Sequence, residues 1–182
     1  MRNSILSHIA FNALDKFAKE KKALPLPWNT ANALELLNIA KEIAKKYEHE
    51  VNESDEKYFL WFSFTNQSQL APLAAFFGGI VAQEAIKAMT GKFGPIHQSF
   101  YYDAIEVLPE LDTKNLEESV NKISYSAKNS RTDGLQMIIG NDIMKIVNQM
   151  KILVVGAGAI GCELLKNFAM LEVGTSENGS II

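Results

Sequence analysis

Cysteine is scarce in this sequence: Cys162 is the only one among 182 residues. A single cysteine excludes an internal disulfide, and no Cys/His spacing resembles that of a zinc site. Without disulfides, the chain is suited to a reducing compartment. We therefore expect a cytoplasmic and nuclear protein.

Long apolar runs and a dominant charge are also missing. No stretch of about 20 apolar residues could span a bilayer, and residues 1–22 lack the pattern of a secretory signal. The 18 basic and 21 acidic residues give a net charge of −3, and the basic residues are scattered. Nucleic acids and anionic membranes select massed basic residues, so we expect neither as a partner. The apolar share of 47% is typical of a soluble globular protein.

The first fifty residues carry the periodic apolar pattern of two amphipathic helices. The first is predicted to begin at Ser4 and to end in the lysine-rich residues 19–22, and Asn29 or Thr30 can cap the second. The proline-rich residues 24–27 form an extended break between them. The predicted apolar faces are Leu6, Ile9, Ala10, Ala13, Leu14 and Phe17, then Ala33, Leu36, Leu37, Ala40, Ala44 and Tyr47. Two such helices predict part of a helical bundle.

The segments that follow give weaker signals. The polar residues 48–57 predict a boundary, and the aromatic residues 58–64 fit either a buried strand or a helix end. Residues 98–108 favour extended chain or a hairpin. Residues 109–130 are polar and charged, which predicts a crossing between two globular parts.

Between these segments, one helix is predicted with a clear beginning and end. Pro72 suits its first turn and Gly91 suits its C-terminal cap. The segment is apolar nearly all round, so we expect a buried helix. Gly78 and Gly79 weaken a helix by about 1 kcal/mol each relative to alanine, and close approach of another backbone is the expected compensation.

The last fifty residues carry the pattern of a phosphate-binding loop. Asn141 can cap a short helix, and residues 152–155 form a continuous β-favouring run, typical of a strand buried on both faces. Gly156, Gly158 and Gly161 follow directly, at the spacing of the dinucleotide fingerprint. They allow a sharp turn, close approach of a phosphate, and close packing of the next helix, respectively. Backbone N–H groups and the helix dipole then favour a bound anion.

The surrounding residues support that interpretation. Residues 180–182 predict a second strand, and Ile160, Leu164, Leu165 and Phe168 are expected to dock the helix on the sheet. A glycine-rich turn without any ligand is the alternative. Glu177 has nearly the spacing of the acid that holds a ribose, but it lies in a polar turn, so we interpret it as a surface residue.

Three segments together resemble the ubiquitin-activating enzymes. They are GAGAIGCELLKNFAML (residues 156–171), LAPLAAFFGGIVAQEAIKAMTGKF (residues 70–93) and YDAIEVLP (residues 102–109). The helices within residues 14–47 more weakly resemble the four-helix bundle of that family.

The resemblance implies an α/β fold, in which a helical-bundle piece precedes parts of two Rossmann-like adenylation domains of the ThiF/MoeB type. Residues 1–57 would be the bundle piece, residues 58–125 the tail of the inactive adenylation domain, and residues 126–182 the unfinished first β-α-β of the active one. We therefore expect a piece of a larger enzyme.

The same resemblance implies an ATP-dependent ligase of the ubiquitin conjugation pathway, which uses Mg-ATP to adenylate the C-terminal carboxylate of ubiquitin before thioester formation. The nucleotide-binding residues would be Gly156, Ala157, Gly158, Ala159 and Gly161. The metal-linked residues, the thioester cysteine and the region for ubiquitin-conjugating enzymes would lie past Ile182. The chain alone is expected to be inactive, and its open sheet edge favours dimers.

Two other functions stay open, and one motif departs from the family. A nicotinamide-dependent oxidoreductase uses the same loop, and a non-enzymatic interaction scaffold is the second alternative. Residues 131–135 read Arg-Thr-Asp-Gly-Leu, where the family usually has Arg-Tyr-Asp-Gly-Gln. Arg131 and Asp133 could fasten the crossing or be solvated charges.

The remaining polar residues favour structural roles. We interpret Cys162 as a small packed residue rather than a nucleophile. The three histidines, His8, His49 and His97, have no cysteine or carboxylate partner at catalytic or metal spacing, so surface or packing roles are expected. Gln83, Glu84 and Lys87 are expected to pair on a helix surface or to border an interface.

Overall fold

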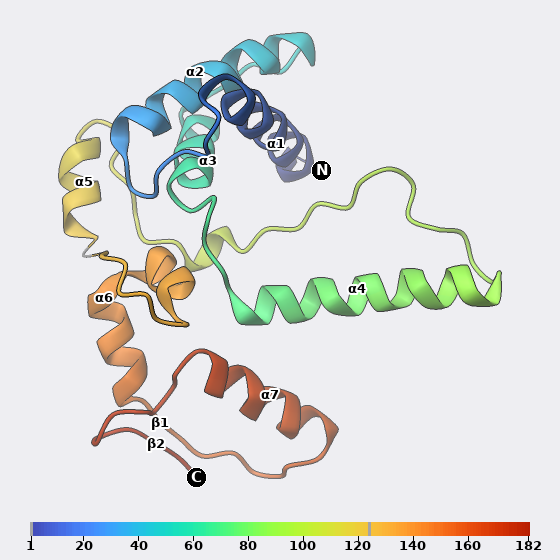
Figure 1. The fold of residues 1–182 in the computed structure, drawn as a ribbon, viewed down its shortest axis with the longest axis vertical. Coiled ribbons are helices and arrows are strands. Elements are labelled where there is room, and N and C mark those ends of the chain that lie inside the picture. Colours follow the sequence, from blue (N-terminus) through green and yellow to red (C-terminus); the bar gives the residue numbers. More distant parts are fainter. Residues whose placement is uncertain (1, 124) are drawn as a thin grey trace. The chain divides into compact units, whose positions relative to one another are not determined.

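The computed structural model describes residues 2–123 and 125–182, which form two compact units. One unit contains the residues up to Gln67 together with Gln98–Lys122, and the other contains Ser68–His97 together with the residues after Lys122. The bundle helices lie in the first unit and the glycine loop lies in the second. Figure 1 shows the elements of both units along the chain.

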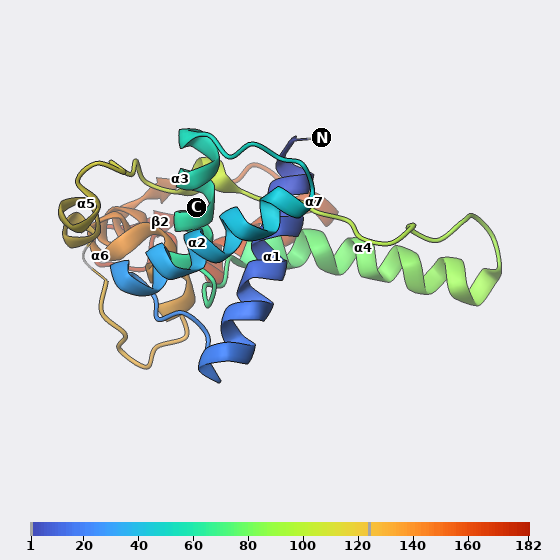
Figure 2. The ribbon, with the colours of Figure 1, turned by 90° about the horizontal axis from the view of Figure 1, so that it is seen from above.

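The first unit is built on α1 (Arg2–Lys21), α2 (Thr30–Lys46) and α3 (Glu53–Phe64), which pack against one another (Figure 1, Figure 2). The helix α1 begins two residues before the predicted Ser4. The apolar periodicity predicted most of the core residues of α1 and α2 correctly, but Leu14 is half-buried and Tyr47 is 44% exposed. The buried residues include Leu6, Ile9, Ala10, Ala13 and Phe17 of α1, Ala33, Leu36, Leu37, Ala40 and Ala44 of α2, and Phe59, Leu60, Trp61 and Phe64 of α3.

Short side chains cap two of these helices. At α2, the side chain of Asn29 accepts a hydrogen bond from the backbone of Asn32 at 2.9 Å, as predicted for this cap. At α3, Asn52 and Asp55 form a capping box in which each side chain accepts from the other's backbone N–H. The polar stretch therefore starts a helix, and the undecided residues 58–64 belong to it.

The buried Asp55 also contacts His49. The carboxylate of Asp55 lies 3.1 Å from Nε2 of His49, so this histidine does have a carboxylate partner. His8 is bound on both ring nitrogens, by the hydroxyls of Tyr101 at 2.7 Å and Tyr47 at 2.9 Å. These partners were missed because helix turns and a returning segment bring them together.

The returning segment of the first unit is mostly irregular. Within residues 98–108 there is a single 3-10 turn, η1 (Ile105–Val107), and no hairpin is found among the described residues there. The predicted crossing contains a further helix, α5 (Leu116–Lys122), in which Leu116 is buried. Its seven residues were too few for periodicity to reveal.

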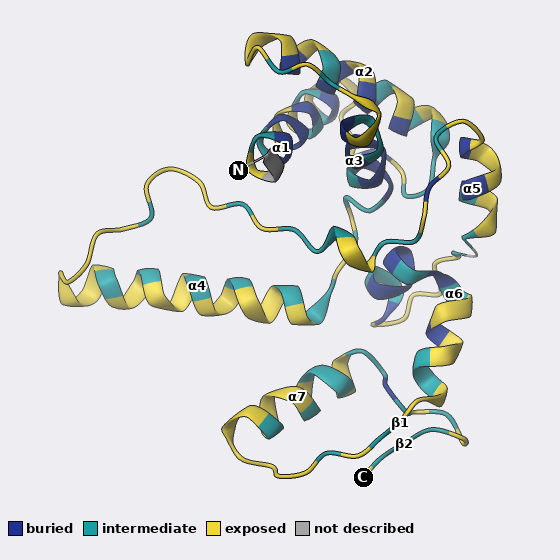
Figure 3. Ribbon diagram, turned by 180° about the vertical axis from the view of Figure 1, so that it is seen from behind, coloured by how far each residue is buried: buried dark blue, intermediate teal, exposed yellow. Residues whose placement is uncertain are grey.

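In the second unit, α4 (Ala71–Thr90) ends as predicted, at Gly91 with a φ of 63°. The expectation that this helix is buried was wrong for this chain. Figure 3 shows exposed and half-buried residues along its length; none of its residues is buried, and Met89 is 78% exposed. A Cβ added at Gly78 or Gly79 would meet nothing within 4 Å, so no backbone approaches there. An apolar sequence makes burial favourable but does not supply the surface that covers it.

Next in this unit is α6 (Asp133–Gln149), which is kinked at Gly140 with φ 74° and ψ 167°. The predicted helix after Asn141 is its second half, and the first half was not predicted. The carboxylate of Asp133 accepts hydrogen bonds from Oγ of Ser130 at 2.7 Å and the backbone of Lys128 at 3.0 Å, which lower its pKa. Asp133 therefore fastens the start of this helix.

The unit ends with β1 (Lys151–Ile152), α7 (Ala159–Met170) and β2 (Ser180–Ile181). The two strands pair in parallel, with Lys151 opposite Ser180. The observed strand β1 is shorter than the predicted strand of residues 152–155, and the predicted segment is not buried on both faces, since Val155 is 89% exposed. With only these two strands in the described part of the chain, the structure is mostly helical.

The bundle part of the predicted fold is therefore confirmed, and the two Rossmann-like domains stay a prediction. The three-part division of the chain also stays a prediction, although α3 runs across its first boundary after residue 57. Among the described residues, no helix has the length and apolar character needed to cross a membrane.

Candidate functional site

The glycine loop connects β1 to α7 with unusual backbone geometry. Gly156 has a φ of 92°, in the left-handed region that favours glycine. Gly158 is the N-cap of α7 and provides no side-chain hydrogen bond to it. The first helical bond runs from the backbone N–H of Cys162 to the carbonyl of Gly158 at 2.9 Å. The N–H groups at the start of α7 have no partner within the helix and suit an anion.

The other two glycines differ in why they are needed. A Cβ added at Gly161 would lie 2.2 Å from the carbonyl oxygen of Gly156, so only glycine allows α7 to approach the loop this closely. A Cβ at Gly158 would meet nothing within 4 Å, and its φ of −75° is ordinary. The fold therefore demands glycine at residue 161, whereas at residue 158 glycine leaves open space beside the helix start.

Two further residues of the loop can be placed. The thiol of Cys162 donates to the carbonyl of Ala157 at 3.2 Å. Cys162 is exposed, so the expectation of a packed residue was wrong. Ala159 begins α7 beside Gly158. The structure thus brings the five predicted loop residues into one turn, and their binding of a nucleotide stays a prediction.

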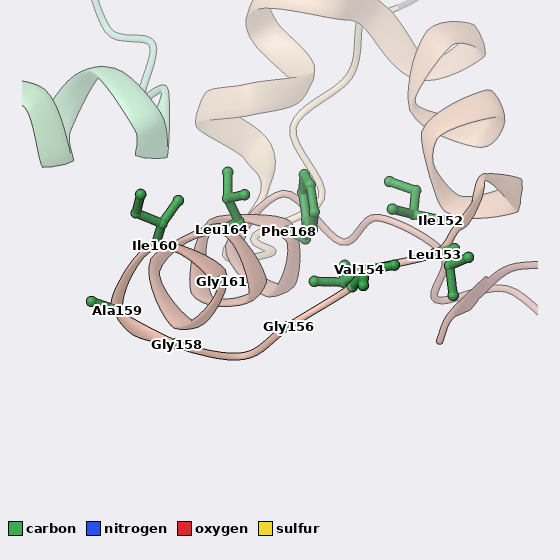
Figure 4. Close-up of a pocket in the computed structure, with 11 residues that line it drawn as sticks. Ile152, Leu153, Val154, Gly156, Gly158, Ala159, Ile160, Gly161, Leu164 and Phe168 are labelled. Carbon is green, nitrogen blue, oxygen red and sulfur yellow. The ribbon is translucent and has the colours of Figure 1, made fainter.

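Next to the loop lies a hollow of about 610 Å³ (Figure 4). It is lined by Ile152, Leu153, Val154, Val155, Gly156, Gly158, Ala159, Ile160, Gly161, Leu164 and Phe168. None of these residues has a polar side chain, so only backbone groups could contact a phosphate here.

The hollow also shows how α7 meets the strand. Ile160, Leu164 and Phe168 form a row along one side of α7 in Figure 4. They were expected to dock on the sheet, yet Ile160 is 78% exposed and Leu164 is also exposed. The helix therefore keeps an uncovered apolar side, because the two-residue strands offer little surface to cover it.

The described residues offer no resident metal site. No group of three His, Cys, Asp or Glu side chains comes together in this part of the chain. Glu177 is exposed, as predicted.

The far end of α7 is held by residues that sequence reasoning missed. The backbone N–H groups of Val173 and Glu172 donate to the carbonyls of Phe168 at 3.0 Å and Ala169 at 3.3 Å, which is the Schellman pattern of helix ends. Glu172 has a φ of 57°. For a non-glycine residue this left-handed conformation costs about 1–2 kcal/mol of conformational free energy, so glycine is usual at this position.

The side chain of Glu172 has a specific partner in Arg131. Nε of Arg131 lies 3.3 Å from the carboxylate of Glu172, and Nη2 of Arg131 donates to the carbonyl of Ala169 at 2.9 Å. The side chain of Asn148 donates to the carbonyl of Glu172 at 2.8 Å. Arg131 is therefore a fastening residue, although its side chain is 61% exposed.

Known proteins match nearly the whole chain. Residues 1–44 match the family of the ubiquitin-activating enzyme E1 four-helix bundle. The chain is 42% identical over 177 residues, or 96% of its length, to ubiquitin-like modifier-activating enzyme 1 of Oryctolagus cuniculus. It is 40% identical over 171 residues to the protein of that name from Dictyostelium discoideum, and 38% identical over 177 residues to ubiquitin-activating enzyme E1 1 of Arabidopsis thaliana, covering 94% and 97% of this chain.

These matches place the chain in the ubiquitin-activating enzyme family, as the resemblance of the glycine loop and the upstream segments predicts. The chain spans 16% of the length of each of these three relatives. It is thus the counterpart of one segment of those proteins.

The contrast between Gly158 and Gly161 gives a testable prediction. Gly161→Ala should force the helix start away from the carbonyl of Gly156 and destabilise the second unit by about 1–3 kcal/mol, as overpacking does. Gly158→Ala is the matched control and should leave the ligand-free loop in place. Hydrogen exchange of residues 151–170 distinguishes the two variants. Equal protection in both would contradict the close approach.

Proposed function

We propose that the chain works as one segment of a ubiquitin-activating enzyme and contributes the glycine-rich loop that holds ATP. The observation that supports this most directly is a glycine loop at an uncapped helix start between two parallel strands. Nearly the whole chain is similar to proteins named for activating ubiquitin or ubiquitin-like modifiers. The longer protein would be an ATP-dependent ligase.

In this proposal the loop acts through its backbone. Gly156, Ala157, Gly158, Ala159 and Gly161 border the phosphates and ribose of ATP. The start of α7 attracts phosphate by its free N–H groups and its dipole, and Gly158 leaves the space for that approach. ATP supplies the adenylyl group that makes the C-terminal carboxylate of ubiquitin reactive. The charged side chains and the magnesium ligands would come from outside this chain.

The fold of the longer protein is part of the same proposal. Residues 1–57 belong to the helical bundle, residues 58–125 to an inactive Rossmann-like adenylation domain, and residues 126–182 to the first β-α-β of an active one. The apolar sides of α4 and α7 fit this assignment, since further parts of such domains would cover them. The chain alone would be inactive.

Partners and location follow from the proposed enzyme. The longer protein would bind ubiquitin, and ubiquitin-conjugating enzymes through regions outside this chain, in the cytoplasm and the nucleus. The relatives are ubiquitin-activating enzymes rather than oxidoreductases, which favours this function over a nicotinamide-dependent reaction. A scaffold without nucleotide binding would leave the open space at Gly158 unexplained.

A segment exchange tests the proposed function. The matching segment of the Oryctolagus cuniculus relative is replaced by this chain, and ubiquitin-dependent exchange between ATP and pyrophosphate is measured. We expect activity in the chimera, and a loss of at least tenfold when it carries Gly158→Ala, because a methyl group would occupy the space of a phosphate. Lys145→Ala, which removes an exposed ion pair on α6, is the control. A folded chimera without exchange activity would contradict the proposal.

The isolated chain should bind ATP weakly, if it binds at all. The loop offers backbone contacts, and the hollow beside it has no charged side chain to add affinity. Calorimetry with Mg-ATP should show no binding in the micromolar range. Tight magnesium-dependent binding would show that this chain contains a complete nucleotide site.

The isolated chain should also self-associate. One edge of β1 is free of strand partners in the described structure, and the exposed residues Leu153 and Val155 follow it. Open apolar edges pair with other chains. Light scattering should show dimers at high concentration, and Val155→Lys should reduce them. A monomer at all concentrations would argue against an open edge.

A further inference from the structure

The two ends of α7 are held in different ways. Its N-terminus has no side-chain cap, and the loop before it is exposed. Its C-terminus carries the Schellman hydrogen bonds, the Arg131 contacts and the Asn148 contacts described above. Polar side chains therefore fix this helix mainly at the end away from the loop.

The residues that hold this end come from one neighbouring element. Arg131 directly precedes α6, and Asn148 lies in its last turn. Asn148 donates to Oγ1 of Thr175 at 2.9 Å, and its carbonyl accepts from the backbone of Ser176 at 3.0 Å. The segment that follows α7 is thus tied to both ends of α6. Val173 in this segment is buried, which adds an apolar contact to the same junction.

The conformation of Glu172 indicates that its side chain matters. The left-handed φ of this residue would be accommodated best by glycine, yet a glutamate occupies the position and faces Arg131. Glycine at this position would relieve the backbone and lose the carboxylate. The ion pair with Arg131 is the contact that glycine at this position would lose.

We infer that Arg131 and Glu172 are positioning residues for the glycine loop, and that they act through α7. A helix of 12 residues is a rod of about 18 Å, so a change of direction at its C-terminus displaces its N-terminus. The use of this arrangement for ATP rests on the proposed function, whereas the arrangement itself is independent of any nucleotide.

Cys162 provides a reporter at the distant end of α7. It is the only cysteine, it is exposed, and its thiol is bonded to the loop carbonyl of Ala157. Displacement of the helix start breaks this bond and changes the rate at which the thiol reacts with an aromatic disulfide reagent. The full 182-residue chain is used, without nucleotide.

The variants test the ion pair directly. Arg131→Ala should raise the reaction rate of Cys162 by about two- to fivefold, the range expected for loss of an exposed ion pair. Arg131→Glu alone should have at least the same effect, and Arg131→Glu combined with Glu172→Arg should return the rate toward that of the unmodified chain. Lys145→Ala removes an exposed ion pair on α6 without touching α7 and should have no effect.

Two controls separate positioning from general destabilisation. Circular dichroism should show unchanged helix content in each variant, and denaturant midpoints should lie close together. An unchanged rate in Arg131→Ala, or a double variant no better than the single one, would overturn the inference. In the chimera, the same variants should weaken ATP binding; if the thiol effect is present and ATP binding is unaffected, the arrangement stands and its use for ATP fails.

Discussion

The close approach of Gly161 to the carbonyl of Gly156 is the constraint on which the second unit depends. It lets α7 begin immediately beside the loop, where a side chain would force the two apart. With Gly156 in a left-handed conformation, the chain leaves β1, turns and enters α7, and the thiol of Cys162 donates to the carbonyl of Ala157 within this turn. The direction of α7 is then set at its far end. Because no side chain caps the start of α7, the side-chain contacts at its far end hold the helix in place.

The two units handle similar apolar sequences differently. In the first unit, three amphipathic helices bury their apolar faces on one another, and aromatic residues such as Phe59 and Phe64 are fully enclosed. In the second unit, α4 and α7 are as apolar but remain exposed. Since burial of apolar surface contributes roughly 25 cal/mol per Å², such surfaces favour any partner that covers them. The helices of the bundle bury one another's apolar faces. In the unit that carries the loop, α4 and α7 would need further protein surface to cover theirs.

Whether a helix is covered by other parts of the chain also limits what could be predicted from the sequence. Periodicity and capping residues identified α1, α2 and α4 because those signals are local. The glycine spacing located the loop for the same reason. The exposure of α4 was mispredicted because burial depends on the surrounding chain. The type of residues 58–64 in α3 was left undecided, because this helix starts inside a polar stretch with Asn52 as its cap. The helix α5 was missed because it is only seven residues long.

The anchor at α7 shows where local reasoning ends. Arg131 and Glu172 lie 41 positions apart, and neither belongs to a motif that would pair them. A glutamate just after a predicted helix gives no sign of a left-handed conformation, since glycine is what normally marks that position. Only the folded chain shows that the carboxylate of Glu172 meets a guanidinium there. The charged residues that hold the end of α7 are therefore ones that a search for phosphate-contacting side chains would pass over.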